Sequence, residues 1–167
     1  DTTNIIKEPG RILSKKSRLI SSQLQVARYD QESTDEISTL SQKSLISIMA
    51  DKIGSNYDCI LLSDYGKGIL TEALTQKIIK LAKKNLIKVL VDPKGHNYSK
   101  YKGAFLLTPN KKEASDATKI EIIDDESLFK AISLLKNKYE LDFSLITLSE
   151  NGIAIYDDEL RKYASLS

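Results

Sequence analysis

The chain has 167 residues, of which 41% are hydrophobic and 29% charged, and its formal net charge is +2 at pH 7. This length suffices for one domain with a sizeable core, and the near-neutral charge argues against a dedicated nucleic-acid binder. The single cysteine, Cys59, excludes an internal disulfide and is typical of a reducing compartment. No apolar run has the length of a membrane span and no signal sequence opens the chain, so we expect a cytoplasmic protein.

The first part of the chain predicts an arm, a β-hairpin and a helix. Residues 1–11 carry no periodicity, whereas residues 18–20 and 24–29 are short β-like runs separated by Ser21-Ser22-Gln23, which is typical of a hairpin. A helix is predicted to begin at Thr34-Asp35-Glu36. Its apolar stripe consists of Ile37, Leu40, Leu45, Ile48 and Met49 and runs up to Gly54.

The rest of the chain alternates short apolar runs with amphipathic helices. Strands are predicted over residues 59–62, 89–91, 105–107 and 143–147, with a closing hairpin over 152–156 and 160–163 around Asp157-Asp158. Helices are predicted after Thr71 as the N-cap, after Pro109-Asn110, and from Asp124-Asp125. The strand over residues 59–62 is expected to be buried on both faces of the sheet, with Cys59 in the core. The alternation implies right-handed βαβ crossovers and a three-layer α/β fold with one mainly parallel sheet.

Two polar turns follow the first two of these strands. Asp64-Tyr-Gly-Lys67-Gly68 combines glycines, which allow the backbone to approach a ligand closely, with a lysine that can bind phosphate. It lacks the spacing of a P-loop, and the alternative is a strand-to-helix turn with a solvated lysine. Asp92-Pro-Lys94-Gly95 repeats the pattern, although its acid and base can simply neutralise each other. Because parallel strands end at one edge of a sheet, the two turns together favour a site at that edge.

Two later segments have both a functional and a structural interpretation. Asn110 and Glu113 lie on one face of the predicted helix and offer the hard oxygen ligands that Mg²⁺ takes, often through water. The same spacing forms a helix capping box, which is the interpretation that spacing alone favours. Residues 147–152, Thr-Leu-Ser-Glu-Asn-Gly, suit either a nucleotide-binding turn or a plain hairpin entry. His96 has no partners for a nucleophilic triad and is interpreted as a loop histidine.

Taken together, these segments resemble the ribokinase-like sugar kinases and, more closely, the heptose 7-phosphate kinase domains of bacterial ADP-heptose synthases. The resembling motifs are Ser63-Asp64-Tyr-Gly-Lys67-Gly68, Val91-Asp92-Pro-Lys94-Gly95, Tyr101-Lys-Gly103-Ala104, Leu107-Thr108-Pro-Asn110 and Thr147-Leu-Ser149-Glu150-Asn-Gly152. Lys16-Ser-Arg18 and Arg28-Tyr-Asp30 are similar to the lid hairpin of this family. The resemblance covers about residues 14–165, and the first two motifs in this order are its specific part.

The resemblance implies a ribokinase-like fold, with residues 14–30 as a lid hairpin and residues 31–167 as the α/β body. It implies transfer of the ATP γ-phosphate to the anomeric hydroxyl of D-glycero-D-manno-heptose 7-phosphate, in ADP-heptose synthesis for the lipopolysaccharide core. It also implies a Mg²⁺ requirement and a homodimer formed through the lid hairpin. In such phosphoryl transfer the protein mainly positions groups and screens charge.

The resemblance further assigns site residues to three groups. The substrate and phosphate group consists of Asp64, Lys67, Asp92, Lys94, Arg18 and Arg28. The nucleotide group consists of Asn110, Thr147, Ser149, Glu150 and Gly152. Asn110 and Glu113 are expected to organise the metal through water.

The chain departs from the family pattern in three places. It contains neither the Gly-Asp sugar-binding strand, nor the Gly-Ala-Gly-Asp motif that supplies the catalytic Asp, nor an adenylyltransferase domain. We therefore expect the central fragment of one kinase domain, from a bifunctional parent, and expect the fragment itself to be inactive. Two alternatives stay open at this point: another ribokinase-like carbohydrate kinase, and a non-catalytic flavodoxin- or receiver-like α/β module.

Overall fold

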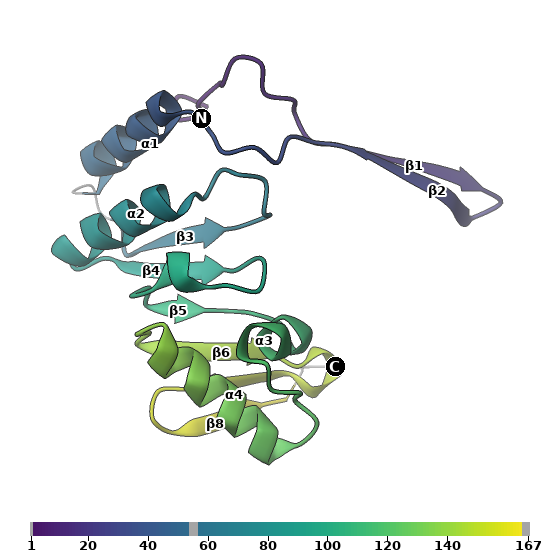
Figure 1. Ribbon diagram of the computed structural model, residues 1–167, viewed down its shortest axis with the longest axis vertical. Coiled ribbons are helices and arrows are strands. Elements are labelled where there is room, and N and C mark those ends of the chain that lie inside the picture. Colours follow the sequence, from purple (N-terminus) through teal and green to yellow (C-terminus); the bar gives the residue numbers. More distant parts are fainter. Residues whose placement is uncertain (1, 54–56, 165–167) are drawn as a thin grey trace.

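The computed structural model describes residues 2–53 and 57–164, which form one sheet with a helical layer and a projecting β-hairpin (Figure 1). The six-stranded sheet has the order β3-β4-β5-β6-β7-β8. Its first four strands are parallel: β3 (Cys59–Ser63), β4 (Lys88–Asp92), β5 (Leu106–Leu107) and β6 (Phe143–Thr147). The last two, β7 (Ile153–Tyr156) and β8 (Leu160–Tyr163), are antiparallel. The prediction of a mainly parallel α/β sheet with a closing hairpin is therefore confirmed.

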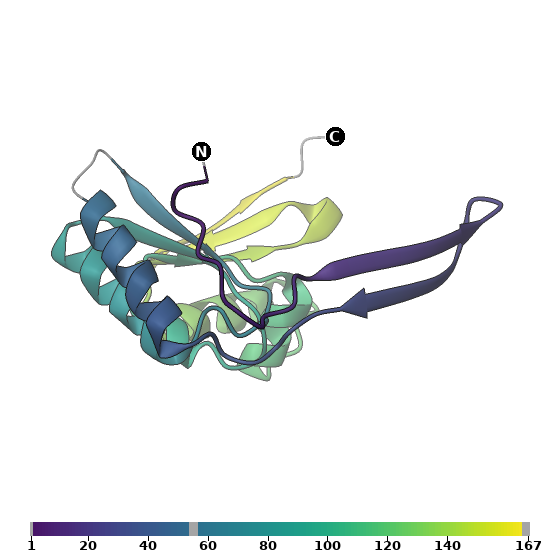
Figure 2. The same cartoon turned by 90° about the horizontal axis from the view of Figure 1, so that it is seen from above.

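The α-helices of the described residues cover one face of this sheet (Figure 2). They are α1 (Thr39–Lys52), α2 (Glu72–Lys84), α3 (Lys111–Thr118) and α4 (Asp125–Lys138). The described residues also form the short 3₁₀ helices η1 (Ser99–Tyr101) and η2 (Ser149–Asn151). Successive parallel strands advance in one direction across the sheet, so right-handed crossovers bring their helices to the same side. Of the three predicted layers, the described residues provide two: the sheet and the helices of this face.

The core lies between these two layers. Each parallel strand contributes buried side chains toward the helices, and α2 and α4 contribute the matching apolar faces. The core includes Leu62, Val91, Leu107, Ile146, Leu74, Ile78, Ile132 and Leu135. The opposite face carries partly exposed side chains, such as Leu90 and Leu145. Among the helices of residues 2–53 and 57–164, none is long and apolar enough to cross a membrane.

Local signals set the starts of three helices as predicted. The Thr71 hydroxyl accepts from the Leu74 amide at the start of α2. Asn110 and Asp124 each form a capping box, at the starts of α3 and α4. Side-chain oxygens at these positions satisfy amides that the first helical turn leaves unpaired, which is why the sequence alone locates them.

Two expectations for the first half of the chain were wrong. Helix α1 begins at Thr39 with Ser38 as its N-cap, not at residues 34–36, because the Ser38 hydroxyl accepts from the Ser41 amide. Leu40 is consequently 76% exposed, and the predicted end at Gly54 lies outside the described residues. Strand β3 is buried on one face only and Cys59 is exposed, because the helices lie on the other side of this strand.

The hairpin consists of β1 (Lys15–Ser21) and β2 (Leu24–Gln31), paired antiparallel, and projects from the body (Figure 1). Ser22 and Gln23 form its two-residue turn, with φ of 48° and 69°, a left-handed pair that suits the twist of hairpin strands. Every residue of both strands is exposed.

The N-terminal arm and a glycine hold the base of this hairpin to the body. The Arg11 guanidinium donates to the carbonyl of Asp35 at 2.9 Å and to that of Lys67. Gly68 packs so closely that a Cβ atom there would lie 2.0 Å from the Asp35 carbonyl oxygen, and its own carbonyl accepts from the Ile37 amide. The segment that follows the hairpin, residues 34–37, thus packs against and hydrogen-bonds to the turn after β3.

Candidate functional site

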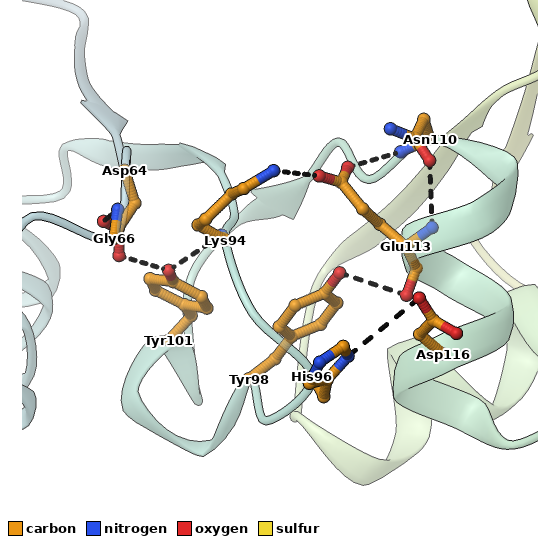
Figure 3. Close-up of polar contacts among 9 residues, drawn as sticks. All are labelled: Asp64, Gly66, Lys94, His96, Tyr98, Tyr101, Asn110, Glu113 and Asp116. Carbon is orange, nitrogen blue, oxygen red and sulfur yellow. Dashed lines mark hydrogen bonds and ion pairs between the residues drawn. The ribbon is translucent and has the colours of Figure 1, made fainter. Parts of the chain in front are cut away.

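The site that the structure brings together lies at the carboxyl edge, the edge of the sheet where β3, β4, β5 and β6 end. Register places Ser63 beside Asp92, and an isolated bridge places Asn110 beside Thr147. The Asp64 amide donates to the Asp92 carbonyl at 3.0 Å, so the first two polar turns are adjacent. Figure 3 shows Asp64, Lys94, Asn110 and Glu113 grouped at this edge.

Asp64 is buried and its carboxylate is fully engaged within the chain. It accepts from the Gly66 amide at 2.7 Å, from the Tyr101 hydroxyl at 2.6 Å, and from the Lys100 ammonium group. Burial raises the pKa of Asp64, but the bonds from Lys100, Tyr101 and Gly66 outweigh it and leave the pKa below its ordinary value. The group is therefore a stable anion that fixes the turn after β3.

Lys94 and Glu113 form an ion pair at the centre of the carboxyl edge. The Lys94 Nζ lies 3.0 Å from the Glu113 Oε1, and the lysine side chain is 54% exposed. The hydrogen bond and charge of Glu113 raise the pKa of Lys94, so it remains a cation. This arrangement presents a positive charge to solvent at the point where the strands end.

Asn110 and Glu113 form the capping box that spacing favours. The Asn110 Oδ1 accepts from the Glu113 amide at 2.9 Å, and the Glu113 Oε2 accepts from the Asn110 amide at 3.1 Å. Each carboxylate oxygen of Glu113 thus has one partner and retains a free lone pair. Among the described residues no group of three or more His, Cys, Asp or Glu side chains forms a direct metal site.

Asp92 has the opposite electrostatic character to Asp64. Burial and the nearby charge of Glu113 raise its pKa, while Lys94 and a hydrogen bond from Ser63 partly offset the rise. A raised pKa means that the surroundings disfavour its negative charge when no cation is bound. Asp92 is thus the carboxylate of this edge whose charge an added cation would stabilise.

Lys67 lies toward the hairpin base, where it pairs with Glu32. Both residues line a cavity of about 420 Å³, with Lys16, Ser63, Asp64 and Tyr65 among its other lining residues. Arg18 and Arg28 are cross-strand neighbours on the hairpin. Arg28 forms a bidentate ion pair with the Asp30 carboxylate, with hydrogen bonds of 2.9 and 2.6 Å. Neither arginine lines this cavity, so the structure does not bring the hairpin arginines to the carboxyl edge.

The segment after β6 forms the predicted hairpin entry. It leads into the antiparallel strand β7, with the Leu148 amide donating to the Gly152 carbonyl at 2.8 Å. Ser149 (φ 55°) and Gly152 (φ 83°) adopt left-handed backbone, and Ser149 and Glu150 are exposed. The bridge between Thr147 and Asn110 places this hairpin entry beside the start of α3.

The sequence did not indicate the partners of Asp64. Tyr101 and Lys100 lie 37 and 36 residues further along the chain, and Tyr98 packs on Tyr101 with ring centroids 5.9 Å apart. The motif Tyr101-Lys-Gly103-Ala104 pointed to this segment through the family resemblance, but it did not show that Tyr101 contacts Asp64. His96 behaves as predicted: it is exposed and lies 4.0 Å from Asp116.

The parallel sheet, the strand-end polar turns and the projecting hairpin define a ribokinase-like α/β protein. The chain belongs to the pfkB family of carbohydrate kinases, whose family model matches residues 33–165. The alternative of a flavodoxin- or receiver-like module is therefore wrong.

Relatives and solved structures agree with this assignment. The chain is 59% identical over 159 residues to the "Bifunctional protein HldE" of Aliarcobacter butzleri, covering 95% of this chain and 33% of that protein. It is 53% identical over 164 residues to the protein of the same name from Sulfurimonas denitrificans, covering 98% and 34%. The chain thus spans about a third of the length of these relatives. Phosphofructokinase-2 from Escherichia coli has the same fold, with a TM-score of 0.63 at 17% identity over 83% of this chain and 46% of that one.

Proposed function

We propose that the chain is part of an ATP-dependent kinase that phosphorylates the anomeric hydroxyl of D-glycero-D-manno-heptose 7-phosphate, on the route to ADP-heptose and the lipopolysaccharide core. Two findings support the proposal: membership of the pfkB carbohydrate kinases, and high identity to proteins named bifunctional HldE. The observation that carries it is the Lys94–Glu113–Asn110 group beside Asp92 at the carboxyl edge. We expect the protein to be cytoplasmic.

In this proposal Lys94 and Asp92 face the transferring phosphoryl group. Phosphoryl transfer spreads negative charge over the equatorial oxygens, so a fixed cation that is half in solvent stabilises the transition state without a covalent step. Lys94 meets this requirement, since Glu113 holds its ammonium group at the open edge. None of the described residues is assigned as the catalytic base.

Asn110 and Glu113 would hold Mg²⁺ through its water ligands. Bound Mg²⁺ screens the charge of the ATP phosphates during transfer. The free lone pairs of the Glu113 carboxylate accept hydrogen bonds from such waters, and the capping box keeps the carboxylate in place. Asp92 adds a second carboxylate whose raised pKa falls when a cation approaches.

The remaining residues are assigned by their place around this group. Lys67, which lines the cavity at the hairpin base, replaces its ion pair with Glu32 by one with the sugar phosphate. Arg18 and Arg28 approach the substrate when the hairpin closes over it. Residues 147–152 contribute Thr147, Ser149, Glu150 and Gly152 to the nucleotide side, next to Asn110.

We also propose that the hairpin forms a homodimer. It exposes large apolar side chains on two strands whose outer edges are unpaired, a state that proteins usually cover. These side chains are Leu19, Ile20, Leu24, Val26 and Tyr29.

The function is tested on the protein as its gene encodes it, by coupled ADP release with ATP and each of several sugars. We expect turnover with heptose 7-phosphate and little with fructose 6-phosphate or ribose. Lys94→Met should abolish most of this turnover, whereas Lys102→Met, which removes an exposed lysine paired with Glu140, should retain it. Equal turnover of the two variants, or preference for another sugar, would overturn the assignment.

A further inference from the structure

Two residues from outside its own turn form hydrogen bonds with Lys94 (Figure 3). Its backbone amide donates to the Tyr101 hydroxyl at 3.2 Å, and its ammonium group pairs with Glu113 at 3.0 Å. Its stem passes so close to Gly66 that a Cβ atom there would lie 3.3 Å from the Lys94 Cγ. The backbone and the charged end of this lysine are thus each held by a hydrogen bond, although half of the side chain is in solvent.

Asp64 connects Tyr101, which bonds the Lys94 amide, with Gly66, which lies beside the Lys94 stem. One carboxylate oxygen accepts from the Gly66 amide at 2.7 Å, and the other accepts from the Tyr101 hydroxyl at 2.6 Å. The Lys100 ammonium group neutralises this carboxylate and also donates to the Leu70 carbonyl at 3.2 Å. Asp64 is only 6% exposed, and its two carboxylate oxygens are occupied by these three groups.

The geometry points to a role for Asp64 and Tyr101 that the sequence pattern did not suggest. We propose that they are positioning residues, which fix Lys94 in the orientation needed at the transferring phosphoryl group; this inference rests on the proposed kinase function. A free lysine side chain has several rotatable bonds, and holding it in one arrangement before substrate binds removes that entropy cost from the reaction. Asp64 then contributes to phosphate binding through Lys94 instead of by contact.

Tyr98 provides a matched comparison within the same cluster. Like Tyr101 it is fully buried, and its hydroxyl also makes a hydrogen bond, to the Glu113 carbonyl at 3.3 Å. That bond reaches the backbone of α3, which the capping box already fixes, and does not reach the Lys94 turn. Deleting either hydroxyl keeps the ring in the core, so the two variants differ mainly in their connection to Lys94.

The test compares Tyr101→Phe with Tyr98→Phe in the protein as its gene encodes it. We expect Tyr101→Phe to lower kcat about tenfold or more, because small misplacements of a catalytic group have effects of this order, with KM for ATP little changed. Hydrogen exchange of the Lys94 amide should accelerate in the same variant. Tyr98→Phe should lower the melting temperature less, because its hydroxyl makes one hydrogen bond of 3.3 Å, and should leave both kcat and this exchange rate unchanged.

The two readouts keep the inference separate from the kinase assignment. Equal kcat in the two variants, or unchanged exchange at Lys94 in Tyr101→Phe, would overturn the positioning role. If the unmodified protein has no kinase activity, the proposed function fails and hydrogen exchange alone decides whether Tyr101 restrains the turn. If Tyr101→Phe folds only in part, kcat is expressed per folded molecule, with the folded fraction taken from thermal melts, and the same tenfold loss relative to Tyr98→Phe is expected.

Discussion

Replacing Glu113 by alanine separates its proposed role toward Mg²⁺ from its role in the helix cap. In the structure its carboxylate accepts from the Asn110 amide at 3.1 Å and pairs with Lys94 at 3.0 Å. Loss of the cap contact costs about 1 kcal/mol. The ion pair adds less than about 1 kcal/mol, because the Lys94 side chain is 54% exposed. The total of about 1–2 kcal/mol lowers the melting temperature by about 2–8 °C for a chain of this size.

The kinetic effect of Glu113→Ala should be much larger than this loss of stability suggests. Removing one charge-screening contact to the phosphates is expected to lower turnover by about 10²-fold and to move the magnesium dependence to higher concentrations. Thermal melts and magnesium titrations of turnover measure the two effects separately. Ser127→Ala is the matched control, because Ser127 closes the equivalent capping box of α4, away from the carboxyl edge. A lower melting temperature with normal turnover and magnesium response would show that Glu113 is only a helix cap.

Three further predictions concern the isolated chain, the hairpin and pH. The isolated 167-residue chain should give only background ADP release with heptose 7-phosphate, and turnover near that of the whole gene product would contradict this. Leu24→Lys with Val26→Lys, at two exposed apolar residues of β2, should convert a dimer to a monomer in sedimentation experiments without lowering the melting temperature. Asp64→Asn should destabilise the chain by about 3 kcal/mol at pH 7. Because the folded pKa of Asp64 is depressed, its contribution is present above the ordinary pKa of about 4 and is lost as pH falls through the folded value. The deficit of Asp64→Asn should therefore shrink at lower pH, and a constant deficit would refute this.

Sequence signals were sufficient wherever a short segment determines its own structure. The capping residues Thr71, Asn110 and Asp124 were predicted because a side-chain oxygen and its target amide lie three residues apart. The apolar runs located the parallel strands, and their common direction located the edge where Lys94 and Asn110 meet.

The errors arose where distant contacts decide the outcome. Residues 34–36 have the composition of a helix start. Their backbone, however, packs against Gly68 and accepts a hydrogen bond from the Arg11 guanidinium, so α1 begins later, with Ser38 as its N-cap. Likewise, nothing near Asp64 in the sequence shows that its carboxylate is occupied, since Tyr101 and Lys100 belong to a segment more than thirty residues away. Ionic partners of this kind depend on the tertiary fold.

The most direct test of the proposed function is to identify the product by ³¹P NMR. The protein as its gene encodes it would be incubated with ATP, Mg²⁺ and D-glycero-D-manno-heptose 7-phosphate. A new phosphate resonance coupled to the anomeric proton, appearing together with ADP, is the predicted result. ADP formation without an anomeric phosphate, or phosphate transfer to a different hydroxyl, would contradict the assignment of this chain to a heptose 7-phosphate kinase.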